Sequence, residues 1–146
     1  MKLLFFIFIL NLVHQYGCKI AISEIEAAEY ACYKEVNLKP QDVPTLANFD
    51  KVNEDTENYR KIFGCIFTKM GIIDAQEKII SEGVDNLAET LSKTASDPVK
   101  QIIIESFQPC KNITGENAGD TGLQFKNCIR TAALKFRENL LSRNSI

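Results

Sequence analysis

Residues 63–74 read FGCIFTKMGIID and place a cysteine inside an apolar helical face that ends at a glycine. The apolar side chains around it recur every three or four residues, the spacing of one face of a helix. They are Tyr59, Ile62, Phe63, Ile66, Phe67 and Met70. Asp55 or Thr56 can cap the start of this helix, and Gly71 can end it in a left-handed conformation. The stretch therefore predicts an amphipathic helix that carries Cys65.

The segments before this helix also have helical spacing or break signals. Residues 22–36 place four residues on one stripe, with acidic residues on the other side. The four are Ile25, Ala28, Cys32 and Val36. Pro40 and Pro44 then interrupt the chain, and we expect a short helix around Thr45 to Phe49.

Three further helices are predicted after Gly71. Residues 74–77, DAQE, have a capping-box pattern that predicts the start of a fourth helix. Residues 96–98, SDP, predict the start of a fifth, which Pro109 would stop. Asp120 or Thr121 is expected to begin the last helix. No segment shows sustained strand alternation, so the sequence predicts an all-α fold of about six short helices.

The N-terminus has the pattern of a signal peptide. Lys2 is followed by the apolar run 3–13 and a polar stretch to Gly17, and we expect cleavage after Gly17, Cys18 or Ala21. Residues 1–17 are then a leader, residues 18–146 form a single domain, and the protein is secreted. The apolar run is shorter than the 18 or so residues of a membrane span, so no membrane insertion is expected.

Charge and histidine content exclude several classes of partner and reaction. The formal net charge is −2, without a basic run, which argues against nucleic acid and anionic membranes as partners. The single histidine lies at position 14, inside the predicted leader. The mature chain therefore has no histidine base or ligand, and with no Cys-x-x-Cys cluster we expect no catalytic residues, metal or cofactor.

The five cysteines of an exported chain indicate disulfides. Cys18 lies at the edge of the leader and is the odd one. The other four cysteines allow three pairings, and their spacing alone does not choose among these.

The positions of those four cysteines resemble the insect odorant-binding proteins, the pheromone and general odorant-binding family. Cys32 is similar to the first cysteine of the family's six. Cys65, within residues 63–74, is similar to the third, while Cys110 and Cys128 are similar to the fourth and sixth. The resemblance covers the mature chain and is closest to the four-cysteine, or C-minus, subgroup.

The two absent cysteines would have been partners of each other in that family. Counting back four residues from Cys65 gives Lys61, and counting back nine from Cys128 gives Gly119. The resemblance thus implies the pairs Cys32–Cys65 and Cys110–Cys128, and helices arranged around an internal apolar cavity.

The resemblance also implies a function, that of a secreted carrier for small apolar organic ligands such as odorants or pheromones. Its partners would be the ligand and, only indirectly, a membrane receptor, and it would be a monomer or weak dimer. The candidate pocket residues are Tyr59, Ile62, Phe63, Ile66, Met70, Ile80, Leu87, Leu91, Ile103, Phe107, Phe125, Ile129 and Phe136. Each of these can equally be plain core.

Other observations leave alternatives open. Tyr30, Tyr33, Tyr59, Thr68 and Thr131 are candidates for one hydrogen bond that orients a ligand. Asn112 opens an N-glycosylation sequon that can also be an unused tripeptide. The rival to a carrier is a secreted protein-interaction module that has an exposed apolar face and no cavity.

Overall fold

The computed structural model describes residues 22–39 and 56–143. This part of the chain is all-α and contains no strand, which confirms the predicted fold class. Its elements in chain order are α2 (Ile22–Glu35), α3 (Glu57–Lys69), α4 (Ser81–Ser92), α5 (Asp97–Phe107), the 3-10 helix η3 (Gln108–Asn112) and α6 (Ala118–Arg143). The predicted leader and the predicted helix around residues 45–49 lie outside the described residues.

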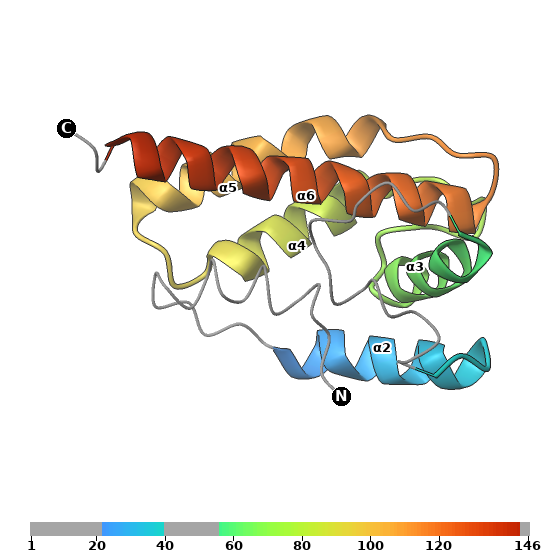
Figure 1. Ribbon diagram of the computed structural model, residues 1–146. Helices are drawn as coiled ribbons and strands as arrows, with labels where there is room; N and C mark the ends of the chain where they lie inside the picture. The colour runs from blue at the N-terminus through green and yellow to red at the C-terminus, as the bar shows by residue number, and fades with distance from the viewer. Residues whose placement is uncertain (1–21, 40–55, 144–146) are drawn as a thin grey trace.

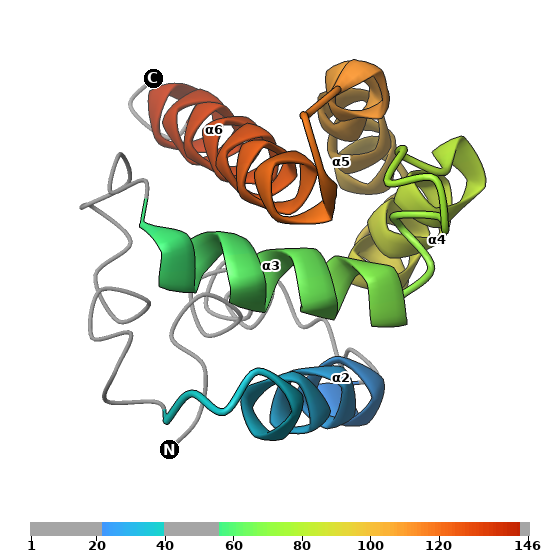
Figure 2. The same cartoon turned by 90° about the vertical axis from the view of Figure 1, so that its right-hand side faces the viewer.

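Helix α3 lies at the centre of the arrangement (Figures 1 and 2). It packs against α6 on one side and α2 on the other, while α4 packs on α5 and α5 on α6. The core between these helices is built from the apolar face of α3, with Ile62 and Phe63 fully buried, and from Phe125 and Ile129 of α6. The hydrophobic periodicity seen in the sequence therefore faces the interior as predicted.

The ends of α3 follow the predicted signals. Thr56 is the N-cap, and its Oγ1 accepts a hydrogen bond from the backbone N of Tyr59 at 3.2 Å. Gly71, just beyond the C-terminus, has a φ of 70°, which glycine adopts without steric cost. These two residues fix the length of the helix that carries Cys65.

The backbones of α3 and α6 touch where they cross. A Cβ on Gly122 would lie 2.6 Å from the backbone N of Gly64, and a Cβ on Gly64 would lie 2.9 Å from the carbonyl C of Ala118. Only glycine permits this approach. Gly119 faces the same crossing, and a Cβ there would lie 3.0 Å from the carbonyl O of Arg60.

The predicted start of the fourth helix at residues 74–77 is wrong. Asp74 instead organises a tight loop, because its Oδ1 accepts hydrogen bonds from the backbone N of Gln76 at 2.8 Å and of Lys78 at 2.9 Å. An antiparallel bridge between Ile73 and Ile79 closes the loop, and α4 begins only at Ser81. An aspartate side chain can accept hydrogen bonds from the N–H groups of a turn as readily as from those at a helix N-terminus. The DAQE sequence therefore forms a turn here and not the start of a helix.

The last helix begins slightly earlier than predicted, at Ala118 rather than at Asp120 or Thr121. Asn117 caps it, since its Oδ1 accepts a hydrogen bond from the backbone N of Asp120 at 2.9 Å. Thr121 has another role. Its hydroxyl is buried and donates to the carbonyl O of Glu77 at 3.1 Å, which ties the loop before α4 to α6.

Two disulfides connect the helices. Cys32–Cys65 joins α2 to α3, and Cys110–Cys128 joins η3 to α6, each with a Cα–Cα distance of 5.7 Å. These are the pairs that the resemblance implied. Among the described elements, α2 packs mainly against α3, and the first disulfide joins these two helices covalently.

Candidate functional site

A pocket of about 670 Å³ lies between α2, the C-terminal end of α3 and α4. Its volume is within the usual range for small-molecule sites. From α2 it is lined by Glu24, Ile25, Ala27, Ala28 and Ala31; from the end of α3 and the residues after it by Lys69, Met70 and Ile72; and from α4 by Gly83, Asn86, Leu87 and Thr90.

Small residues create the space. Three alanines of α2, Ala27, Ala28 and Ala31, line the pocket, and their short side chains leave room beside the helix. Gly83 lies on the α4 side of the pocket, where it allows close packing instead of leaving space. A Cβ on Gly83 would clash with the carbonyl O of Gly71, so glycine lets α4 pack directly against the residues that follow α3.

Two links hold the α2 wall in place. The Cys32–Cys65 disulfide lies in the interior, and the Lys69 Nζ forms an ion pair with a Glu35 carboxylate oxygen at 2.7 Å. The ion pair is partly exposed, so its contribution to stability is about 0–1 kcal/mol. The disulfide therefore dominates the attachment of this wall.

Two of the predicted pocket residues, Met70 and Leu87, line this pocket. Two more, Ile80 and Ile103, are half-buried. The other nine are buried in the core, each at most 7% exposed: Tyr59, Ile62, Phe63, Ile66, Leu91, Phe107, Phe125, Ile129 and Phe136. Sequence reasoning missed the alanines of α2, although Ala28 belongs to the stripe that it identified.

The structure narrows the candidates for a ligand hydrogen bond. Tyr30 is 75% exposed and points to solvent. The hydroxyls of Thr68 and Thr131 donate to the carbonyl O atoms four residues earlier, of Gly64 at 2.7 Å and Asn127 at 3.0 Å. Of the five candidates, Tyr59 is buried and Tyr33 is half-buried.

Among the described residues, one acidic side chain on α2 and one basic side chain on α6 are buried. Glu29 is 7% exposed, and burial, aided by the nearby charge of Glu26, raises its pKa to about 8. Lys126 is 8% exposed, and burial, aided by the positive charge of Arg130, lowers its pKa to about 8. The pKa of Tyr33 is also raised, first by burial and then by Glu29 and Tyr59.

A stack of aromatic rings runs along α3 and reaches α6. The rings of Tyr59 and Phe63 stack with centroids 6.1 Å apart, those of Phe63 and Phe67 with centroids 6.0 Å apart, and Phe125 meets Phe67 edge-on at 4.9 Å. Such pairs add to the stability that burial itself supplies. They also give this part of the interior large, flat apolar surfaces.

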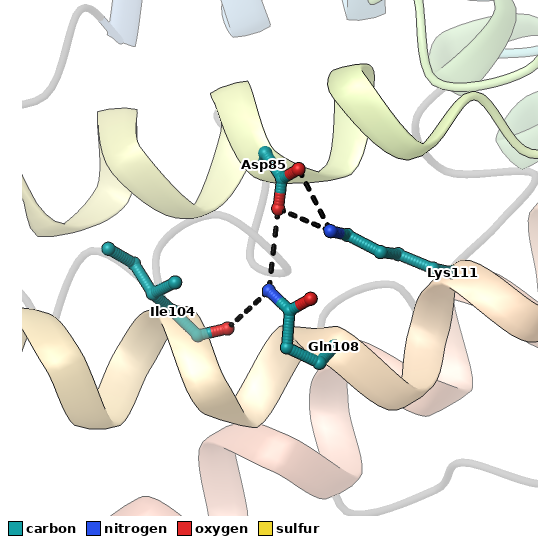
Figure 3. Close-up of polar contacts among 4 residues, drawn as sticks. All are labelled: Asp85, Ile104, Gln108 and Lys111. Atoms are coloured by element: carbon teal, nitrogen blue, oxygen red, sulfur yellow. Dashed lines mark hydrogen bonds and ion pairs between the residues drawn. The ribbon is translucent and has the colours of Figure 1, made fainter.

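Outside the pocket, a polar clamp joins α4 to η3 (Figure 3). The Lys111 Nζ forms an ion pair with Asp85 Oδ1 at 2.7 Å, and Gln108 Nε2 donates to Asp85 Oδ1 at 3.4 Å and to the carbonyl O of Ile104 at 3.2 Å. The hydrogen bond from Lys111 lowers the pKa of Asp85. The clamp positions the segment that carries Cys110, and we assign it a structural role.

The described residues contain no group of three potential metal ligands. Among the same residues, no helix is long and apolar enough to cross a membrane. Asn112 is exposed at the end of η3, and its glycosylation stays a prediction.

The described residues thus form a helical domain with two disulfides and a pocket between α2 and α4. A family model for the PBP/GOBP family matches residues 20–132, so the chain belongs to that family. The fold is similar to that of odorant-binding protein dmelOBP28a from Drosophila melanogaster, with a TM-score of 0.62 and 19% sequence identity over 79% of this chain and 93% of that one. A comparison with curated proteins finds no match.

Proposed function

We propose that this chain is a secreted carrier that binds small hydrophobic molecules in the pocket between α2 and α4. The observation that carries the proposal is that pocket, with its apolar lining, in a chain of the PBP/GOBP family. Family membership supports odorants, pheromones or similar compounds as ligands. The odorant-binding protein of similar fold supports the same class of ligand.

Desolvation would supply most of the affinity. A ligand that buries about 300 Å² of apolar surface gains about 7.5 kcal/mol at 25 cal/mol per Å². Micromolar binding corresponds to about 8 kcal/mol, so a few weak polar contacts suffice in addition. Asn86 lines the pocket and can supply such a contact, whereas the Thr90 hydroxyl donates to the carbonyl O of Asn86 at 2.7 Å and could only accept from a ligand.

Secretion is part of the proposal. It is supported by the signal-peptide pattern of residues 1–17 and by the two disulfides, which form in oxidising compartments. Membership of the four-cysteine subgroup is likewise proposed, on the grounds that Lys61 and Gly119 occupy the positions of the absent pair. We propose no catalytic role.

The test is a titration of the oxidised, secreted protein with an environment-sensitive apolar dye, followed by competition with volatile compounds and fatty acids. The chain contains no tryptophan, so intrinsic fluorescence interferes little. We expect saturable one-to-one binding that some compounds displace and others do not. A folded protein with both disulfides and no saturable binding would instead support a protein-interaction module.

A pocket-filling variant locates the binding. Ala28→Phe places a large ring among the residues that line the pocket and should weaken dye binding about tenfold or more. Ala75→Phe is the matched control, because Ala75 is exposed in the loop before α4 and does not line the pocket. Equal effects of the two substitutions would mean that the dye binds elsewhere.

A further inference from the structure

The chain contains a single N-glycosylation sequon, Asn112-Ile113-Thr114, with a residue other than proline in the middle as the motif requires. The pocket between α2 and α4 does not include these residues. Tripeptides of this kind also occur unmodified, so the placement of the sequon in the fold has to show whether a bulky glycan can be accommodated there.

The fold presents the two recognised side chains to solvent. Asn112 is the last residue of η3 and Thr114 lies in the loop that follows, and both are exposed, whereas Ile113 between them is half-buried. The backbone at Ile113 is extended, with φ −64° and ψ 132°. Successive side chains of an extended segment point to opposite sides, so Ile113 packs inward while the side chains of Asn112 and Thr114 point outward.

The residues beside Asn112 hold this segment in place. Cys110 is buried and joined to α6 by its disulfide, and the Lys111 Nζ forms an ion pair with Asp85 of α4 (Figure 3). The backbone N of Ile113 donates to the carbonyl O of Cys110 at 3.4 Å. A glycan attached to the exposed side chain of Asn112 would leave each of these contacts intact.

We propose that Asn112 carries an N-linked glycan, added while the chain passes through the secretory pathway. The donor is a lipid-linked oligosaccharide pyrophosphate. A bond forms between the Asn112 Nδ2 and C1 of the first sugar, and the bond from that carbon to the pyrophosphate oxygen breaks. The lipid pyrophosphate leaves with the electron pair of that bond, the amide nitrogen releases one proton, and nothing is oxidised or reduced. The modification requires secretion and therefore rests on that part of the proposed function.

The glycan and the pocket would lie on opposite sides of α4. Figures 1 and 2 show η3 and the loop after it on the side of the fold away from α2, and η3 packs against α4, α5 and α6. Asp85 is the residue of α4 that contacts Lys111 of η3. At about 100° per residue, the residues of α4 that line the pocket lie about 100–200° around the helix from Asp85. They are Gly83, Asn86, Leu87 and Thr90.

The experiment expresses the full chain, with its own leader, in cultured eukaryotic cells. Peptide mass spectrometry of the secreted protein should find a glycan on the peptide that contains Asn112, and an aspartate at that position after release by a peptide N-glycosidase. Asn112→Gln and Thr114→Ala should abolish the glycan, while Thr114→Ser should retain it, because serine supplies the same hydroxyl. Asn139→Gln is the matched control and should retain it, since Asn139 is exposed on α6 and lies outside the sequon.

The outcomes separate the modification from the carrier function. Secreted wild-type protein without a glycan at Asn112 overturns the proposal, whether or not the variants fold. A chain that stays inside the cells without a glycan overturns the modification and the secretion together.

A second comparison tests the placement of the glycan. The dye is titrated into the glycosylated protein and into the same protein after enzymatic removal of the glycan, and we expect equal affinities. A loss of binding that glycan removal reverses would contradict a position on the far side of α4. If neither form binds the dye, the carrier function fails while the glycan found at Asn112 still confirms the modification.

Discussion

The contact between the glycines of α3 and α6 provides the sharpest test of the fold. A Cβ added at Gly122 would lie 2.6 Å from the backbone N of Gly64 and 2.7 Å from the carbonyl C of Phe63. Both neighbours are backbone atoms, so the helices must separate to admit a methyl group. Overpacking of this kind costs about 1–3 kcal/mol, while replacing a helical glycine by alanine returns up to about 1 kcal/mol. We expect Gly122→Ala to destabilise the protein by about 1–2 kcal/mol.

A graded series controls for helix propensity. At Gly64 the nearest atoms are 2.9 Å away, and at Gly119 the nearest atom, the carbonyl O of Arg60, is 3.0 Å away. The destabilisation should therefore decrease from Gly122→Ala through Gly64→Ala to Gly119→Ala, which should lie within about 0.5 kcal/mol of wild type.

The assay is urea unfolding of the oxidised protein followed by far-UV circular dichroism, with thermal unfolding as a second readout. A cost of 1 kcal/mol corresponds to a fall of about 3–5 °C in Tm for a chain of this size. The reasoning is refuted if Gly122→Ala is as stable as wild type, or if the three variants follow the opposite order. Either result would mean that the helices do not meet at these glycines.

Three further predictions concern stability. Lys61→Cys with Gly119→Cys should restore the absent bridge, increase the free energy of unfolding by up to about 4 kcal/mol in the chain-entropy model, and raise Tm. An unchanged Tm with the bond verified would show that these are not the equivalent positions. Between pH 4.5 and about 8, Glu29 is ionised in the unfolded state but keeps its proton in the folded state, so stability should fall as the pH rises. Between about 8 and 10.5, Lys126 has lost its proton in the folded state but keeps it in the unfolded state, so stability should rise. Urea unfolding across this range should show a minimum near pH 8, and a maximum there would contradict the burial of both groups. Asp85→Ala removes the partly exposed ion pair to η3 and should lower stability only slightly in the same assay, whereas a large loss of stability would show that the clamp is essential to folding.

Capping residues in the sequence predicted the helix boundaries correctly where no alternative turn could use the same side chain. Thr56 and Gly71 bound α3 as expected, and Ser96 is the N-cap of α5. The prediction failed at Asp74, because an aspartate can bond the N–H groups of a turn or of a helix with the same geometry. The bridge between Ile73 and Ile79 favours the turn over the helix, and the capping pattern of residues 74–77 alone does not reveal it.

The pocket was harder to predict than the fold, for a physical reason. Phe63 and Met70 belong to the same apolar face of α3, yet Phe63 is enclosed by other rings while Met70 lies at the open end beneath α2. Hydrophobic periodicity identifies the face of a helix that is buried. It does not show which other elements pack against each turn of that helix. The alanines of α2 were missed because small side chains carry a weak hydrophobic signal, although they determine where space remains.

The most direct test of the carrier function uses the methionine at the pocket. The chain has two methionines, and one of them, Met1, belongs to the predicted leader, so a secreted protein labelled at its methionine methyl group reports on Met70 alone. We predict that this single NMR signal shifts saturably as an apolar ligand is added, with the midpoint of the dye competition, because Met70 lines the pocket. If the ligand binds saturably and the Met70 signal does not move, the ligand is not held between α2 and α4, and the proposed site is wrong.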